Sequence, residues 1–176
     1  MPSTAVTPGS PHRRSLFVCA EDTAESAAAC EWALKHFYKE GDVVHMTYVV
    51  TCLTQRTEVF HGVVGGSYSL QQSVEAREEN RLLAEARARL EERFLPLLRP
   101  KLVPYQLHLY AEREDVGLQR VAQLLLQDIE QRDPALVILS AHNKPGSEEG
   151  LGSVAEFISL NCHRPRAIVR PHAQGQ

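Results

Sequence analysis

The sequence lacks the features that define several classes of protein. No apolar stretch approaches the roughly 20 residues that a membrane-spanning helix needs. The 19 Lys and Arg residues are mixed with 22 Asp and Glu residues, for a formal net charge of −3, so the charge does not indicate a nucleic-acid partner. The phosphate-binding pattern G-x4-G-K-[ST] is absent, and no Ser, His or Cys stands in a recognisable catalytic context. We therefore expect a binding protein and not an enzyme.

Cysteine is also scarce. The chain has four cysteines, and their positions show neither a CxxC pair nor the spacing of metal ligands. Cys19 lies in an apolar run and Cys30 on a predicted helix, so we expect both to be small core residues of a protein in the reducing cytoplasm. Cys162, near the end of the last predicted helix, is best explained as structural.

What remains is a chain of ordinary globular composition. Its 176 residues, 43% of them hydrophobic, fit one domain with a sizeable core, which we assign to residues 13–171. Residues 1–12 are rich in Pro, Ser and Thr and lack the apolar run of a signal peptide. We expect them to form a disordered tail, with a short transit segment as the alternative. Residues 172–176 are expected to form a C-terminal tail.

Helical and strand patterns alternate along the chain. Apolar or alternating runs predict five strands, and the run at residues 105–110 alternates as a half-exposed strand at a sheet edge does. A spacing of three and four residues predicts four helices, the first with Thr23 as its N-cap and with Trp32, Ala33, Leu34 and Phe37 on its inner face. Residues 51–69 are expected to be a long surface loop. The predicted strands are 15–20, 43–50, 105–110, 135–140 and 166–170, and the predicted helices are 27–38, 70–98, 115–131 and 152–162. This order predicts an α/β fold with a mostly parallel, doubly wound sheet covered by helices on both faces.

Ligands of such sheets bind beyond the carboxyl ends of the strands. Three segments converge there if the first and fourth strands are neighbours: residues 21–23, 49–51 and 140–154. In the last of these, Gly152, Ser153 and Val154 begin a helix after a glycine-bearing loop. The start of a helix exposes unpaired N–H groups and a partial positive charge, which together favour a phosphate.

Several segments resemble the universal stress protein family. Val18–Ser26 is similar to that family's opening V-D-x-S-x-x-S, and Glu31–His45 to its first helix and second strand. Asp133–His142, Gly152–Val154 and Arg164–Val169 resemble its closing signature. The resemblance covers roughly residues 13–171. It implies a five-stranded sheet of order 3-2-1-4-5, a role in the stress response, and a homodimer formed through the last strand.

The resemblance also implies an adenine-nucleotide site. Members that bind ATP carry G-x2-G-x9-G-[ST], and the matching positions here are Ser140, Asn143 and Gly152-Ser153, with eight residues instead of nine in the second gap. By motif position, ATP, with magnesium where the neighbouring carboxylates require it, would contact a set of eight residues. These are Glu21, Val49, Ser140, His142, Asn143, Gly152, Ser153 and Val154. Gly146, Ser147 and Gly150 offer further backbone contacts, and Lys144 a charge.

Other readings of the same residues stay open. Ser140, the shortened loop and the acidic pair Glu148-Glu149 favour a second hypothesis, in which the same fold binds no nucleotide and acts as a dimeric protein-interaction domain. Glu21 and Asp22 also fit a solvated turn, and Gly152-Ser153 fits a plain helix start. The charged run at residues 73–93 is most simply a solvated helix face.

An enzymatic hypothesis has weaker support. Glu21, Asp22 and Lys144 are similar to the phosphoacceptor site of response regulators. That site also needs a central aspartate, and no aspartate lies between Asp42 and Asp115. Slow ATP hydrolysis is compatible with nucleotide binding, but the sequence indicates no general base for it.

Overall fold

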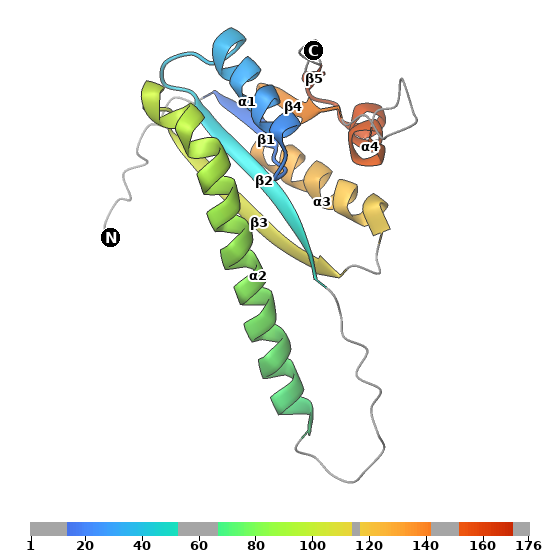
Figure 1. Cartoon of the computed structure of the whole chain (residues 1–176). Helices are drawn as coiled ribbons and strands as arrows, with labels where there is room; N and C mark the ends of the chain where they lie inside the picture. The colour runs from blue at the N-terminus through green and yellow to red at the C-terminus, as the bar shows by residue number, and fades with distance from the viewer. Residues whose placement is uncertain (1–13, 53–66, 114–116, 142–151, 171–176) are drawn as a thin grey trace, which may run out of the picture.

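The computed structural model describes residues 14–52, 67–113, 117–141 and 152–170 (Figure 1). Strands and helices alternate along these residues, as the sequence predicts. In chain order the elements are β1 (Ser15–Cys19), α1 (Ala24–His36), β2 (Val43–Cys52), α2 (Ser67–Leu98), the short 3-10 helix η1 (Arg99–Lys101), β3 (Tyr105–Arg113), α3 (Gly117–Arg132), β4 (Leu136–Ser140), α4 (Ser153–Asn161) and β5 (Arg166–Val169).

The five strands form one sheet of order β3-β2-β1-β4-β5, and every neighbouring pair is parallel. The predicted fold class and strand order are confirmed. All five residues of β1 and of β4 are buried, because both strands are paired on two sides and covered on two faces. Such strands read as continuous apolar runs, which is the pattern that revealed them.

Helices cover both faces of the sheet (Figure 1). Side chains alternate along β1, so Leu16 and Val18 pack in one cluster with α1 and α2, whereas Phe17 and Cys19 pack in another with α3 and α4. Phe17 and Val18 are at most 2% exposed. The molecule therefore has two apolar layers separated by the sheet.

The first helix begins where its cap requires. The Ser26 N–H donates to Thr23 Oγ1 (3.2 Å), which confirms Thr23 as the N-cap. The helix starts at Ala24, three residues before the predicted boundary, and ends at His36. Phe37 therefore lies past the helix and is 39% exposed. Its predicted place on the inner face is wrong, while Ala33 and Leu34 are buried as predicted.

The second helix is longer than predicted. It runs from Ser67 to Leu98 and projects well beyond the end of the sheet (Figure 1). Ala86, Leu90, Phe94 and Leu98 are each about 1% exposed or less and recur every four residues on the face that meets the sheet. Pro96 lies inside the helix near its end. Strand β2 extends to Cys52 and α2 begins at Ser67, so both ends of the loop predicted at residues 51–69 belong to a strand or a helix. The rest of that loop, residues 53–66, lies outside the described part.

Among the described residues, no helix combines the length and apolar character that crossing a bilayer would require.

Cys19, Cys30 and Cys162 are buried and unpaired, as expected for small core residues. Burial, and secondly the charge of Glu31, raises the pKa of Cys30 to about 12. These thiols therefore act in packing.

A buried acid joins α3 to the sheet. Asp128 is 3% exposed and accepts hydrogen bonds from Thr47 Oγ1 (2.7 Å) and the Tyr110 hydroxyl (2.9 Å). Arg132 Nε lies 2.8 Å from the same carboxylate. Burial alone would raise the pKa of Asp128, but the contacts with Arg132, Thr47 and Tyr110 outweigh it and lower the pKa. The buried charge is thus compensated on three sides.

Two histidines extend this polar region between β2 and β3. His45 Nδ1 and His108 Nε2 lie 3.2 Å apart, a distance at which one neutral ring donates a hydrogen bond to the other. Burial, followed by the positive charge of Arg132, lowers the pKa of both rings. Burial and the charge of Arg132 therefore favour the neutral form of both rings in the folded protein.

The histidine pair makes stability depend on pH. A histidine whose pKa is lower in the folded than in the unfolded state binds its proton preferentially after unfolding, so stability falls as the pH drops below about 6.5. We expect the free energy of unfolding in urea to decrease from about pH 7 to about pH 5, and to decrease less in His108→Gln. The difference should stay under the ~1.4 kcal/mol of a one-unit shift, because solvent screens these half-exposed rings.

His163→Gln is the matched control, since it removes an exposed histidine that follows α4. It should leave the pH profile of the wild type unchanged. Equal profiles for the wild type and His108→Gln would show that the pair does not carry this effect.

Candidate functional site

The site forms where the winding of the chain changes direction. β1 and β4 are neighbours in the sheet, and the chain leaves them toward opposite edges, into α1 and β2 on one side and α4 and β5 on the other. In open α/β sheets the ligand crevice lies outside the carboxyl ends of two such strands, so a crevice is expected here between their following turns. The condition under which the three predicted segments converge is thus met.

Hydrogen bonds fix the turn after β1. The Glu21 N–H donates to Ser26 Oγ (3.0 Å), and the Ser26 hydroxyl donates to the Cys19 carbonyl (3.5 Å). The Ala20 N–H donates to the Thr47 carbonyl (2.9 Å). Ser26 is 1% exposed and thus serves as an internal brace. The turn presents Glu21 in one place at the end of β1.

Glu21 itself is half-buried in this turn. Burial, and secondly the negative charge of Glu21, raises the pKa of the Cys19 thiol far above its ordinary value. The charge of Glu21 therefore acts on the end of β1. A carboxylate in this position can accept hydrogen bonds from a ligand's hydroxyl or amino groups. It also repels an anion, so any phosphate has to lie away from it.

Val49 and Val154 lie on the same side of the sheet. Val49, on β2, is 7% exposed and belongs to the apolar cluster that also holds Cys19 and Ala155. Val154, in the first turn of α4, is half-buried and packs against that cluster. Two predicted site residues from distant segments thus belong to one apolar cluster.

The start of α4 offers backbone donors. Gly152 is its N-cap, with φ −58° and ψ 149°, and no side chain caps the helix. The first intrahelical bond runs from the Glu156 N–H to the Gly152 carbonyl (2.9 Å), so the N–H groups of residues 153–155 have no acceptor within the helix. Ser153 is exposed. The value of Gly152 here is its small size, because its backbone angles do not require glycine.

Ser140 takes a different place. It is the last residue of β4 and is 6% exposed, and the next residue, Ala141, donates its N–H to the Val169 carbonyl (3.0 Å). Its side chain is therefore buried at the carboxyl end of β4. His142, Asn143 and the connecting loop through residue 151 lie outside the described residues.

An ion-pair clamp at Asp22 escaped sequence reasoning. Asp22 Oδ1 lies 2.7 Å from Arg93 Nε, and Oδ2 lies 3.4 Å from Arg89 Nε. The three residues, with Glu92, line a cavity of about 340 Å³. The clamp ties α2 to the turn that carries Glu21. Asp22 is therefore held by two arginines in a turn that stays partly exposed to solvent.

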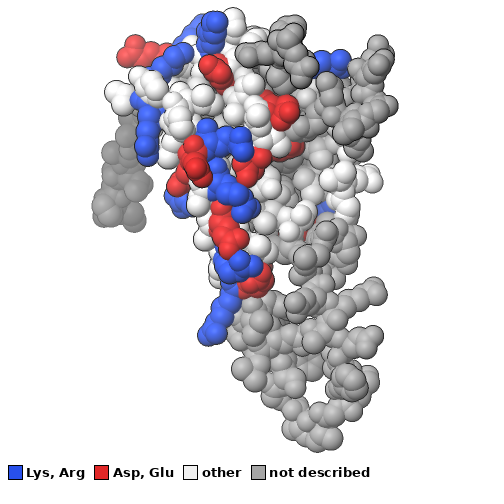
Figure 2. Space-filling view, viewed as in Figure 1, with Lys and Arg blue, Asp and Glu red and all other residues white. Residues whose placement is uncertain are grey.

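The charged face of α2 is only partly a solvated surface. Lys and Arg alternate with Asp and Glu along it (Figure 2), and Arg81 pairs with Glu78 and Glu85 within the helix, where all three are exposed. These pairs fit the predicted solvated face. The side chains of Arg89 and Arg93 do not fit it, because they extend from α2 to Asp22 in the turn after β1. The sequence shows the Arg-x3-Arg spacing, but that spacing does not indicate that Asp22 is the acidic partner of the two arginines.

Within the described residues, no group of three or more His, Cys, Asp or Glu side chains could hold a metal ion. The turns after β1 and β4 instead offer one carboxylate, at Glu21, and a set of helix N-terminal amides, with Val49 and Val154 in the apolar cluster on one side of the sheet. This arrangement suits a ligand with a polar ring or sugar at one end and an anionic group at the other.

The comparisons with known proteins agree in fold. No family model matches the chain. The universal stress protein PHOS32 of Arabidopsis thaliana is 26% identical, over 93% of this chain and 67% of the relative. Two solved structures share the fold at low identity. Universal stress protein UspA from Lactobacillus plantarum has a TM-score of 0.60 and 11% identity, covering 90% of this chain and 98% of its own.

The second is a universal stress protein family protein from Arabidopsis thaliana with AMP bound. It has a TM-score of 0.53 and 12% identity, covering 91% of this chain and 93% of its own. At such identities these two structures establish the fold alone, and the sequence relationship is carried by the first relative. Taken together, the sequence similarity to PHOS32 and the shared fold support the resemblance of this chain to the universal stress protein, UspA-like, family.

Proposed function

We propose that this protein is a stress-response module that binds an adenine nucleotide in the crevice at the carboxyl ends of β1 and β4. The observation that supports the proposal is that the braced Glu21 turn and the start of α4, which has no side-chain cap, follow two neighbouring strands, with Val49 and Val154 in one apolar cluster. The AMP bound to a protein of the same fold supports the choice of ligand.

Each part of the crevice fits one part of a nucleotide. Glu21 accepts hydrogen bonds from the adenosine moiety, and Val49 and Val154 contact its apolar surfaces. The amides at residues 153–155, with the Ser153 hydroxyl, receive the phosphate. Glu21 and the start of α4 belong to separate turns, so the carboxylate and the phosphate need not approach each other.

The number of phosphates follows from charge. The sequence places Glu148 and Glu149 shortly before Gly152, and carboxylates beside a triphosphate cost energy unless a cation intervenes. We therefore propose that ATP binds as its magnesium complex, and that AMP needs no metal. Titration of both nucleotides with and without magnesium separates these cases.

The proposal extends to the setting of the protein. It includes one domain over residues 13–171 with short tails, and a cytoplasmic location. Three buried, unpaired thiols, Cys19, Cys30 and Cys162, support a reducing compartment.

Substitution of Gly152 tests the nucleotide site. Gly152→Val places a branched side chain beside the amides at the start of α4, so we expect the affinity for AMP and for Mg-ATP to fall at least about tenfold, or about 1.4 kcal/mol. The backbone angles of Gly152 are open to other residues, so the fold should persist. Isothermal titration calorimetry measures the affinity, and circular dichroism checks the fold.

Leu160→Val is the matched control, because it introduces the same side chain on the exposed face of α4, where Leu160 is 79% exposed. It should bind nucleotide as the wild type does. The proposed function would be contradicted if the wild-type protein showed neither a heat of binding nor stabilisation against unfolding with millimolar AMP or Mg-ATP.

A second candidate function keeps the fold and omits the nucleotide. It is favoured by the buried side chain of Ser140, which stands where nucleotide-binding relatives are expected to carry glycine. The protein would then act as a dimeric interaction module through β5. On β5, Ile168 is 36% exposed, and the Val169 carbonyl accepts from Ala141, so the backbone groups of Ile168 face the open edge. Arg166 Nη1 donates to the Cys162 carbonyl (2.9 Å) and is thereby drawn back toward α4.

Substitution of Ile168 tests the homodimer, which we propose both for the nucleotide-binding protein and for the interaction module. Ile168→Glu puts like charges opposite each other across a two-fold axis, so we expect the protein to become monomeric in sedimentation velocity at micromolar concentration. Leu118→Glu is the control, since Leu118 is an exposed apolar residue of α3. A dimer that survives Ile168→Glu, or a monomeric wild type, would exclude pairing through β5.

A further inference from the structure

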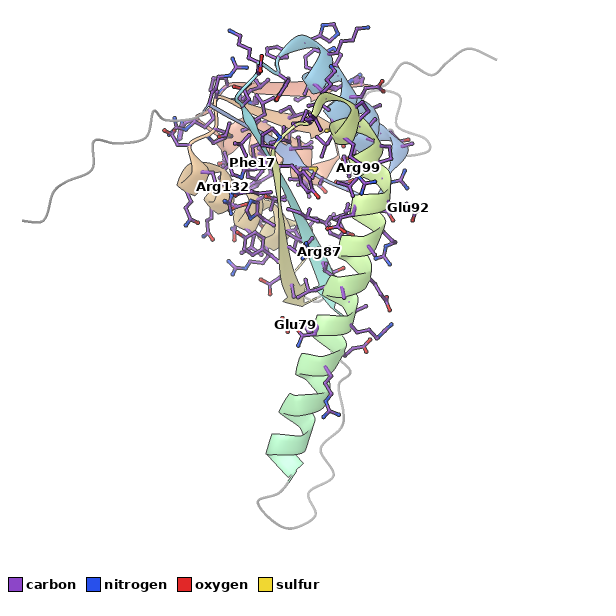
Figure 3. The ribbon with its side chains drawn as sticks, turned by 90° about the vertical axis from the view of Figure 1, so that its left-hand side faces the viewer. Phe17, Glu79, Arg87, Glu92, Arg99 and Arg132 are labelled. Atoms are coloured by element: carbon purple, nitrogen blue, oxygen red, sulfur yellow. The ribbon has the colours of Figure 1, made fainter. Side chains whose placement is uncertain are left out.

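Strand β3 has an open edge. It pairs with β2 along all nine of its residues, and no other strand of the described chain pairs with it. The Val44 N–H donates to the Pro104 carbonyl (2.9 Å). Because alternate residues of a strand point their backbone groups to the same side, the N–H and C=O groups of Leu107, Leu109 and Ala111 point away from β2. Figure 3 shows β3 facing the viewer at the edge of the sheet.

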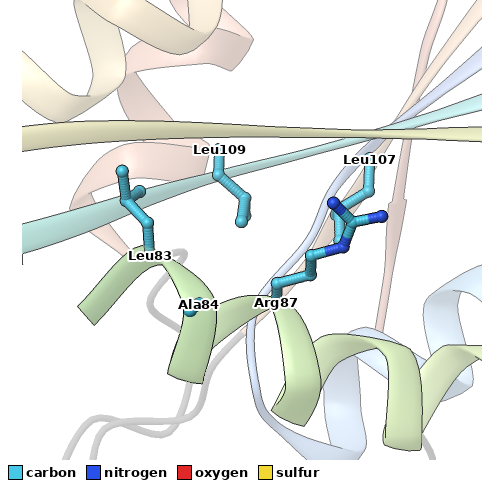
Figure 4. A pocket seen from close by; sticks show the side chains of 5 residues that line it. All are labelled: Leu83, Ala84, Arg87, Leu107 and Leu109. Atoms are coloured by element: carbon cyan, nitrogen blue, oxygen red, sulfur yellow. The ribbon is translucent and has the colours of Figure 1, made fainter. Parts of the chain in front are cut away.

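An apolar groove runs beside this edge. Leu83 and Ala84 of α2 and Leu107 and Leu109 of β3 line it together with Arg87, and its volume is about 370 Å³ (Figure 4). In Figure 3, Arg87 lies on the flank of α2 toward β3. The side chains of Leu107 and Leu109 thus line the groove from the same two residues whose backbone groups are open.

We propose that this surface binds an extended peptide of a partner protein, which adds to the sheet as a sixth strand beside β3. The backbone of the peptide pairs with the open groups of β3, and apolar side chains at alternate positions enter the groove. A carboxylate of the peptide meets Arg87. This is the β-augmentation mode, in which main-chain bonds supply affinity and side-chain pockets supply specificity.

The dimensions agree with an extended peptide. Alternate residues of a strand are roughly 6.6–6.8 Å apart and point to the same side. Leu107 and Leu109 have this relation, so two apolar side chains of a paired strand would meet the groove in the same register. A helical partner could fill the groove but would leave the backbone groups of β3 without protein partners.

The charge of the groove selects the partner. Arg87 Nε pairs with Glu91 (2.8 Å), and the two side chains are 67% and 31% exposed. Surface pairs of this kind contribute little, so exchange of Glu91 for a ligand carboxylate is inexpensive. A second copy of this chain would bring its own Arg87 to the edge. The surface therefore suits an acidic-apolar peptide better than self-association.

Selection from a phage-displayed library of random 10-residue peptides tests the proposal. The protein should enrich peptides with apolar residues at alternate positions and an Asp or Glu beside them. Calorimetry with an enriched synthetic peptide then gives its affinity, and sedimentation velocity reports whether the protein self-associates through β3. Arg87→Glu should weaken an acidic peptide at least about tenfold.

Two variants with matched controls locate the binding surface. Ala111→Pro removes an outward N–H, which edge strands tolerate, and should abolish peptide binding, whereas Ala111→Val keeps the N–H and should bind. Leu83→Glu blocks the groove and should weaken binding at least about tenfold. Ala88→Glu makes a comparable change on the exposed face of α2 and should bind as the wild type does.

Several results would overturn the proposal. They are failure of the library to enrich any peptide over the Leu83→Glu protein, binding that survives both Ala111→Pro and Leu83→Glu, and a wild-type dimer that Ala111→Pro dissociates. If Ala111→Pro does not fold, the pair Leu83→Glu and Ala88→Glu decides alone. Nucleotide affinity should be unchanged in all of these variants, so this test is independent of the proposed function.

Discussion

The arrangement of this protein depends on the burial of one short strand. β1 is paired on both sides and covered on both faces, and each of its five residues is buried. Its alternating side chains hold α1 and α2 on one face and α3 and α4 on the other. Because β2 and β4 pair with its two edges, the turn that follows β1 lies in the middle of the sheet and not at its side. The Glu21 turn therefore emerges in the centre of the sheet, beside the end of β4, where the crevice forms.

The sequence predicted the fold because its signals are local. Buried strands such as residues 136–140 are unbroken apolar runs, and α2 has a clear helical stripe. The start of α1 was harder to predict, because residues 24–28 are small or polar and carry no apolar period, although Thr23 marked the cap. Phe37 was misplaced for a related reason. The apolar pattern continues past His36, but the helix does not, and an apolar residue beyond the end has no inward face.

The predicted site divides in the same way. Glu21 and Gly152–Val154 could be proposed as site residues because each is a short segment next to a strand or helix end. The Asp22 clamp could not, since its arginines follow roughly 70 residues later and many partners were available to them. Asp128 is an intermediate case. It lies within the inward stripe of α3, beside Leu125 and Ile129, and an acid at such a position indicates a buried polar partner, but only the fold supplies Thr47 and Tyr110.

One helix sets the geometry of both proposed binding surfaces. Residues of an α-helix are rotated by roughly 100° from one to the next, so Arg87 and Arg93 lie on opposite flanks of the stripe formed by Ala86, Leu90 and Phe94. Arg93 reaches the turn that carries Glu21, and Arg87 lines the groove at β3. The stripe is buried against the sheet, so neither flank can move without the other. The position of α2 is therefore a shared constraint on the central crevice and on the sheet edge, two surfaces that are otherwise chemically separate.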